Sequence, residues 1–235
     1  MKKIILIAAL TVFCLSTANA QQIKFGVKAG LNISSLRGDY PDEINETRSK
    51  MGFHLGGLMA YAINDKISIQ PELLFSTQGG SSKIKQEYGD GSYYESFQQT
   101  PKLSYLNLPI MFKYMVIDKL SVEIGPQLGY VLSAKSEWEY VDSTDSSENE
   151  TIEVDLLNGG NYNFLGANVE VDGRINRFDF GLNFGSSYTI TDNLFVQARY
   201  NLGLTSVDKN STNQNVFDSW ELKNSVFQFS VGFMF

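Results

Sequence analysis

Eight segments of this chain alternate between apolar residues and small or polar ones. In the first segment the odd-numbered residues from Ile23 to Ile33 are apolar, and the even-numbered residues between them are polar or small. A period of two is typical of a strand with one apolar face. No sustained helical stripe of apolar residues follows residue 20. We therefore expect an all-β protein with strands at 23–34, 51–62, 67–78, 103–114, 120–133, 174–188, 194–206 and 223–235.

The connections between these segments alternate in length. Segments 63–66, 115–119 and 189–193 are short and contain Asn or Asp, as tight turns do. The other four connections are long and polar; they are 35–50, 79–102, 134–173 and 207–222. An even number of strands with short turns at one end and long loops at the other predicts an eight-stranded antiparallel up-and-down transmembrane β-barrel.

Alternation alone does not say which face meets lipid, because a soluble lipocalin-like barrel alternates too. The polar face is rich in glycine and carries three charges of each sign, which suits a narrow interior where an unpaired charge is costly. Aromatic residues on the apolar face cluster near strand ends, as in interfacial girdles. We therefore expect lipid outside and a polar lumen. The charges expected in the lumen are Lys28, Lys113, Arg199, Glu72, Glu123 and Asp179.

The first twenty residues have the layout of a secretory signal peptide. Lys2 and Lys3 precede an apolar stretch at 4–12, and a small-x-small site ends at Ala20. We expect residues 1–20 to be the signal peptide and 21–235 the barrel domain. The only cysteine, Cys14, falls in the predicted signal peptide, so intramolecular disulfides are excluded. The net charge of −7 argues against a nucleic-acid partner.

Three prolines lie inside predicted strands, at Pro71, Pro109 and Pro126. A closed barrel has no free edge at which a missing N–H is harmless. We therefore expect these prolines at bulges or strand ends.

Several short motifs resemble the PorT-like family of small outer-membrane β-barrels. They are FGVKAGLN at 25–32, IQPELLF at 69–75, YLNLP at 105–109, GPQLGY at 125–130, FDFG at 178–181, RYNLGL at 199–204 and GFMF at 232–235. The resemblance implies a barrel of the Gram-negative outer membrane that tolerates the three prolines in place. It also implies that Phe235 is the signal read by the barrel-insertion machinery. The founding type of the family is linked to protein secretion, a role that does not follow from likeness alone.

An eight-stranded barrel has a lumen just wide enough for its own side chains, so a diffusion pore is not expected. The six charges and His54 then form either a structural network that fills the lumen or a proton or ion path. In simple hairpin register Lys113 and Glu123 are diagonal neighbours. A hydrolase using His54 would need an orienting group and a nucleophile within hydrogen-bond reach, and no spacing specifies either.

The segment 134–173 is strongly acidic, with ten acids against one base, Lys135. Three interpretations stay open: a solvated charged loop, a divalent-cation site, or a docking surface for a basic partner. No EF-hand spacing is present, and no metal or other cofactor is predicted. The residues that would carry the second or third role are Asp142, Asp145, Glu148, Glu150, Glu153 and Asp155.

Together these features predict a monomeric, non-enzymatic outer-membrane scaffold with both termini in the periplasm. Its expected partners are membrane lipid, the insertion machinery and an envelope or secretion protein bound through the loops. The alternatives are an accessory component of a secretion apparatus and, from another class, a barrel-rim hydrolase using His54.

Overall fold

A computed structural model of the protein describes residues 23–38, 44, 46–89, 93–209 and 222–235. The predicted signal peptide, 1–20, lies outside the described residues, as does most of the predicted loop 207–222. The elements are β1 (Ile23–Arg37), β2 (Glu46–Ala62), β3 (Ile67–Tyr88), β4 (Tyr93–Ile117), β5 (Leu120–Asp142), the short 3₁₀ helix η2 (Ser146–Glu148), β6 (Glu150–Asp155), β7 (Gly159–Phe164), β8 (Ala167–Asp172), β9 (Phe178–Thr189), β10 (Leu194–Gly203) and β11 (Lys223–Met234).

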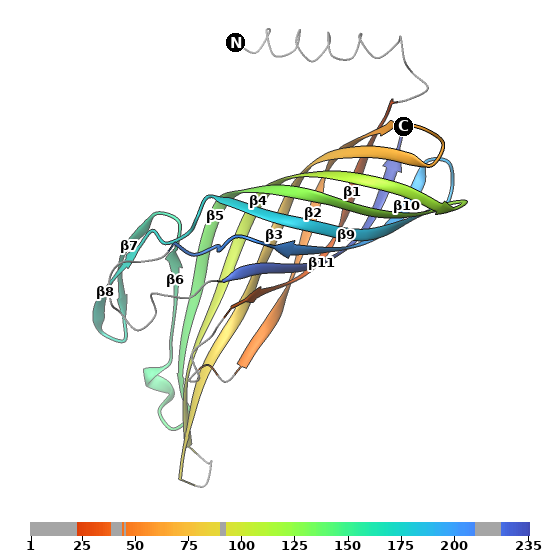
Figure 1. The fold of residues 1–235 in the computed structure, drawn as a ribbon. Coiled ribbons are helices and arrows are strands. Elements are labelled where there is room, and N and C mark those ends of the chain that lie inside the picture. The colour runs from red at the N-terminus through yellow and green to blue at the C-terminus, as the bar shows by residue number, and fades with distance from the viewer. Residues whose placement is uncertain (1–22, 39–43, 45, 90–92, 210–221) are drawn as a thin grey trace.

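Eight of these strands close into an antiparallel ring, in the order β1, β2, β3, β4, β5, β9, β10, β11 (Figure 1). The ring closes between β1 and β11, whose paired residues run from Gly26 opposite Met234 to Arg37 opposite Lys223. Each neighbouring pair along the chain is a hairpin, except that β6, β7 and β8 intervene between β5 and β9. The predicted eight-stranded antiparallel barrel is confirmed.

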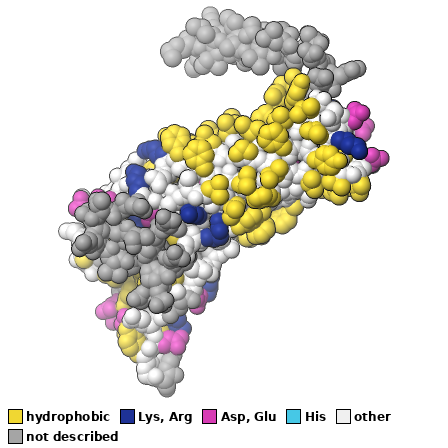
Figure 2. Space-filling model, viewed as in Figure 1, with side chains coloured by type: hydrophobic (Ala, Val, Ile, Leu, Met, Phe, Trp, Pro, Cys, Tyr) yellow, Lys and Arg dark blue, Asp and Glu magenta, His cyan; other side chains and the backbone are white. Residues whose placement is uncertain are grey.

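The side chains of the ring alternate between outside and lumen as predicted. On β11, Phe227 and Phe229 are each 53% exposed, whereas Gln228 between them is 2% exposed. Figure 2 shows hydrophobic side chains gathered on the barrel wall, with charged side chains toward the two ends. Separately, none of the helical residues within the described ranges forms a helix long and apolar enough to span a membrane.

Four strands are longer than the sequence pattern predicted. β2 begins at Glu46, inside the predicted loop 35–50. β3, β4 and β5 continue beyond the ring into segments 79–102 and 134–173, which we expected to be loops. There they pair with one another, and β5 pairs with β6. We call residues 80–88, 93–102, 134–142 and 150–155 the projecting sheet; it extends from one end of the barrel in Figure 1. The sequence analysis missed the projecting sheet because its strands do not have the outward row of apolar residues that marks the barrel strands.

A β-bulge in β5 separates the barrel from the projecting sheet. Val131 and Ser133 pair with the adjacent residues Tyr105 and Ser104, so Leu132 is an extra residue without a place in the ladder. The bulge reverses the alternation of β5: odd-numbered residues point inward before it and even-numbered residues after it. The predicted strand end at residue 133 thus marks a change of side, whereas the strand itself continues to Asp142.

The three prolines lie at neither bulges nor strand ends, which corrects our prediction. The ladder between β3 and β4 is interrupted from Pro71 to Leu74, opposite Pro109, and resumes in the same register. The ladder between β4 and β5 is likewise interrupted from Pro109 to Phe112, opposite Pro126. The ladder between β2 and β3 is interrupted around Pro71, between Glu72 and Ile69, and also resumes in the same register. Each missing N–H therefore leaves a local gap in hydrogen bonding, and the pairs on either side preserve the register.

Glycines on the lumen side allow neighbouring backbones to approach closely. A Cβ atom added at Gly56 would lie 2.0 Å from the carbonyl oxygen of Leu73, and one added at Gly125 would lie 2.0 Å from that of Ile110. Any larger residue at either position would have to push the adjacent strand away. The glycine-rich face is thus a packing requirement of the small barrel.

Candidate functional site

Glu72 lies at the centre of a buried charge network inside the lumen. Its carboxylate is 2.8 Å from the Lys28 Nζ atom and accepts two hydrogen bonds from Arg199, of 2.8 and 3.0 Å. The three side chains come from β3, β1 and β10, and each is 0% exposed. Two parallel bonds between a guanidinium and a carboxylate form the strongest and most directional kind of ion pair.

Glu123 extends this network toward β4 and β5. It accepts a 3.0 Å bond from the Nε of Arg199 and lies 3.7 Å from the Nζ of Lys113. Lys113 and Glu123 are directly opposite in the ladder, not diagonal as we predicted. Gln197 joins the two halves, because it donates to Glu123 at 2.8 Å and accepts from Lys28 at 2.8 Å.

Five of the predicted lumen charges form one cluster, and the sixth lies apart from it. We call Lys28, Glu72, Lys113, Glu123 and Arg199 the lumen network. Asp179 instead accepts hydrogen bonds from the neutral side chains of Asn224, at 2.7 Å, and Thr205, at 2.9 Å. The three cations and three carboxylates predicted for the lumen therefore do not form one cluster. The lumen network itself has three cations and two carboxylates.

His54 is 1% exposed and is held by neutral neighbours on β1 and β11. Its Nδ1 lies 2.7 Å from the Oδ1 of Asn32, and its Nε2 lies 2.7 Å from the Oγ of Ser230. A neutral imidazole offers one donor and one acceptor, so both ring nitrogens are satisfied. The order serine, histidine, amide is that of a nucleophile, base and orienting group, but all three side chains are buried in the lumen.

Neutral amides that the sequence analysis did not single out link the charged residues. Gln70 donates to Glu72 at 2.7 Å and accepts from Lys113 at 3.3 Å. Asn32 donates to Ser76 at 2.9 Å. In the sequence, these amides could have been found by their position on the lumen-facing side of the alternation, because the charged residues were found in the same way.

The acidic segment uses several carboxylates to hold its own turns. Asp142 accepts from the backbone N–H of Thr144 at 2.7 Å, and Asp145 accepts from the hydroxyl of Ser147 at 2.6 Å. These bonds favour the charged forms, so the Thr144 N–H lowers the pKa of Asp142, and the Ser147 hydroxyl lowers the pKa of Asp145. Asp155 accepts in the same way from the backbone N–H of residues 157 and 158.

The remaining predicted acids of this segment lie apart. Glu153 forms an exposed ion pair with Lys135 at 2.6 Å, Glu150 accepts from the backbone N–H of Leu165, and Glu148 lies in η2. Among the residues that the structure describes, no three His, Cys, Asp or Glu side chains are grouped so as to hold a metal ion. In the described part of the segment, the structure therefore shows no cluster of ligands for a divalent cation.

The projecting sheet has two chemically different faces. Its inner face carries an aromatic cluster, in which the ring centroids of Phe97, Trp138 and Phe164 lie 5.9 to 6.1 Å apart. Its outer face carries ion pairs between neighbouring strands, such as Lys102 with Glu137 at 2.6 Å. An outer face made of paired charges is suited to water.

Phe235, the predicted insertion signal, is 71% exposed. Its backbone N–H donates to the carbonyl oxygen of Phe25 at 2.8 Å, which fixes the end of the chain to β1. Its role in insertion stays a prediction.

The comparisons with known proteins agree with a membrane barrel. The family model for the outer membrane protein beta-barrel domain matches residues 19–209. No curated protein matches the chain.

Solved structures with similar folds include Ail, the attachment invasion locus protein of Yersinia pestis, at 12% identity and a TM-score of 0.39, covering 92% of this chain and 100% of that one. Neisserial surface protein A matches at 12% identity and a TM-score of 0.45, with 90% and 97% covered. The Escherichia coli outer membrane protease OmpT matches at 11% and 0.34, with 92% and 98% covered. At such low sequence identities and TM-scores, these similarities say nothing about the activity of this chain.

Proposed function

The chain belongs to the family of outer membrane protein beta-barrel domains, and from this premise we propose that it is a non-enzymatic scaffold of the Gram-negative outer membrane. Its barrel anchors the chain, and the tip of its projecting sheet, residues 84–88 and 93–97, binds a protein partner outside the membrane. We further propose a monomer with both termini in the periplasm. The described ends, at Ile23 and Phe235, lie at the barrel end that carries the short turns, which supports this orientation (Figure 1).

The observation that carries the proposal is the continuation of barrel strands into the projecting sheet. Tyr93–Ile117 is a single strand of 25 residues, far more than the roughly 9–11 that a tilted strand needs to cross a bilayer. A surface built on such strands is held rigidly by the barrel, so a partner binding to it loses little conformational entropy in the loops.

The projecting sheet also offers an edge to a partner strand. The pairing of β2 with β3 ends where Glu46 meets Lys83, whereas β3 continues to Tyr88. Among the described residues, 84–88 therefore pair on one side only. An extended peptide adds to such an edge through main-chain hydrogen bonds.

The lumen supports a role without conduction. The Lys28, Glu72 and Arg199 side chains meet within the lumen at 2.8 Å and are fully buried. An open path for ions through the lumen would require these ion pairs to break, and leaving buried charges unpaired has a high free-energy cost.

Shortening the tip of the projecting sheet tests the scaffold. Residues 84–97 are replaced by Asn-Gly, a two-residue turn that suits the paired ends Lys83 and Gln98. We expect the barrel to keep its heat-modifiable gel mobility and to lose the partner that co-purifies with the wild-type chain from intact membranes. The control Glu137→Gln, on the outer face below the tip, should keep the partner. Equal recovery of the partner with the shortened chain would contradict the proposal.

The PorT-like resemblance favours a second candidate, an accessory component of a protein-secretion apparatus. The same co-purification separates the two, because a secretion component brings transport machinery with it, whereas a scaffold for another envelope protein does not.

The hydrolase alternative depends on the contact of His54 with Ser230. Ser230 is 5% exposed and Asn32 is 0% exposed, so a substrate has no open route to the hydroxyl in this arrangement. We expect a fluorophosphonate probe to leave Ser230 unlabelled in the folded barrel. Labelling that disappears in His54→Ala would favour the enzyme.

A further inference from the structure

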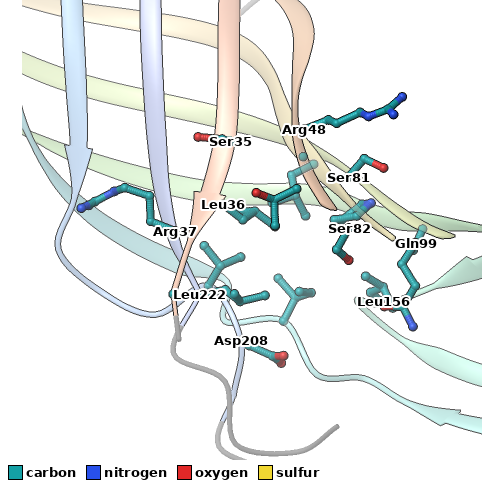
Figure 3. A pocket seen from close by; sticks show the side chains of 18 of the residues that line it. Ser35, Leu36, Arg37, Arg48, Ser81, Ser82, Gln99, Leu156, Asp208 and Leu222 are labelled. Atoms are coloured by element: carbon teal, nitrogen blue, oxygen red, sulfur yellow. The ribbon is translucent and has the colours of Figure 1, made fainter. Parts of the chain in front are cut away.

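A cavity of about 480 Å³ opens at the barrel end that carries the projecting sheet. Its walls come from the ends of β1 and β2, from β3, β4 and β5, and from Leu156, residues 174–175, residues 207–208 and Leu222. In Figure 3, Leu36, Leu156, Leu222, Asp208 and Gln99 surround one space although they come from distant parts of the chain. We call this space the mouth cavity.

Part of the mouth cavity is lined by apolar side chains that belong to a buried core, beside serine, threonine, glutamine and arginine side chains. Leu103, Leu156, Ile175 and Val207 are between 1% and 9% exposed and form one cluster, with Leu36 packed against it. A core that existed only to close the barrel would fill its own space. The volume that stays open lies instead within the roughly 300–1,000 Å³ of small-molecule sites, which combine apolar walls with a few polar groups.

Two buried hydrogen-bonding groups in these walls have no partner within the described part of the chain. They are the Oγ of Ser136, a residue that is 1% exposed, and the Nε1 of Trp138. Both residues line the cavity, and the bulge at Leu132 places both on the inner face of β5. Buried polar groups in folded proteins are nearly always paired, so these two lack an acceptor, which a ligand in the cavity would supply when the two side chains turn toward it.

The charge at the rim favours an anionic acceptor. The described lining contains three arginines and one acid. Arg174 pairs with Asp208 at 2.9 Å and Arg48 pairs with Glu46 at 2.6 Å, whereas Arg37 donates to a neutral group, the carbonyl oxygen of Gly203, at 3.2 Å. Among the described lining residues the arginines therefore outnumber the acids, on a chain whose net charge is −7.

We propose that the mouth cavity binds a small amphipathic carboxylate. The apolar body of the ligand packs against Leu36, Leu103 and Leu156, and its carboxylate accepts from Ser136 and Trp138. Arg37, whose side chain extends away from the cavity in Figure 3, attracts the anion from the rim through its charge. This site is independent of the partner surface at the tip of the projecting sheet, so either proposal can fail without the other.

Sodium 4-phenylbutyrate is the probe, added to the full barrel domain in lipid nanodiscs. The chain has two tryptophans, and Trp220→Phe leaves Trp138 as the only source of an indole ¹⁵N–¹H signal. We expect this signal to shift saturably as the probe binds its N–H. A shift that grows only linearly with probe, as partitioning into lipid produces, would overturn the proposal, as would no shift.

Variants locate the contacts, with gel mobility as the check on folding. Trp138→Phe and Ser136→Ala each remove one donor, and each should weaken binding about tenfold by calorimetry. Arg37→Gln should weaken phenylbutyrate but leave the neutral analogue 4-phenylbutan-1-ol unchanged. The control Glu139→Gln, on the outer face next to Trp138, should change nothing. Equal affinities across all four variants would contradict the assigned site.

Discussion

Glu72 joins cations from two other strands, and the sequence could not reveal that contact. The lumen-facing parity of β3 placed its carboxylate inside the barrel, but Arg199 is 127 residues away along the chain. Which lumen charges lie at the same height depends on the stagger of the strands around the ring, a property that no local pattern encodes. For the same reason we grouped Asp179 with these charges, although it lies beside Asn224 and Thr205.

Neutralising Glu72 should destabilise the barrel strongly. Glu72→Gln leaves Lys28 and Arg199 buried with one carboxylate fewer, and breaking a buried ion pair typically costs ~3–5 kcal/mol. The matched change Glu137→Gln breaks the pair with Lys102, whose side chains are 43% and 41% exposed, and should cost about 0–1 kcal/mol. Urea unfolding in lipid vesicles measures both. Similar midpoints for the two variants would show that the lumen network contributes little.

At the scale of elements, alternation located all eight barrel strands, but four of them, β2, β3, β4 and β5, extend further than it predicted. In 79–102 and 134–173 the outer residues are charged or polar, as in Lys83, Gln98 and Glu137, because that face meets water and not lipid. The pattern that marks a membrane strand therefore disappears although the strand continues. The bulge at Leu132 adds to this, since it reverses which side each residue of β5 faces.

This reversal predicts a labelling pattern in the projecting sheet. The single cysteine of the sequence lies in the predicted signal peptide, so introduced cysteines report alone. In a membrane-reconstituted chain, Glu137→Cys and Glu139→Cys should react quickly with a water-soluble maleimide. Ala134→Cys should be protected, because Ala134 is 1% exposed and does not line the mouth cavity. Fast reaction of Ala134→Cys together with protection of the other two would place the bulge elsewhere.

The turn after β5 should be insensitive to mild acid. Because the Thr144 N–H lowers the pKa of Asp142, the stabilisation by its carboxylate is fully present above the ordinary pKa of about 3.9 and is lost only as pH falls through the lower folded value. We expect the hydrogen-exchange protection factor of the Thr144 amide to be constant from about pH 7 to about pH 5. In Asp142→Ala it should be low throughout. Protection lost in the wild type already above about pH 5 would contradict this assignment.

At the scale of the whole molecule, the sequence was sufficient for the ring because each part of the pattern agreed. Short turns at 63–66, 115–119 and 189–193 forced neighbouring strands into hairpins, and an even strand number let the ring close. Where the chain is not constrained by the bilayer, as in the excursion through β6, β7 and β8, the arrangement depends on packing that composition does not specify. This excursion supplies part of the wall of the mouth cavity, through Leu156, Arg174 and Ile175, so only the structure could reveal the cavity.

The central claim is that the apolar face of the ring meets lipid and the charged face fills the lumen. Spin labels on β11 in lipid bilayers measure this through their collisions with oxygen, which concentrates in the acyl region. Labels at Phe227→Cys, Phe229→Cys and Val231→Cys should show high oxygen accessibility, and labels at Gln228→Cys and Ser230→Cys should show low accessibility. The reverse alternation, or none, would contradict the account.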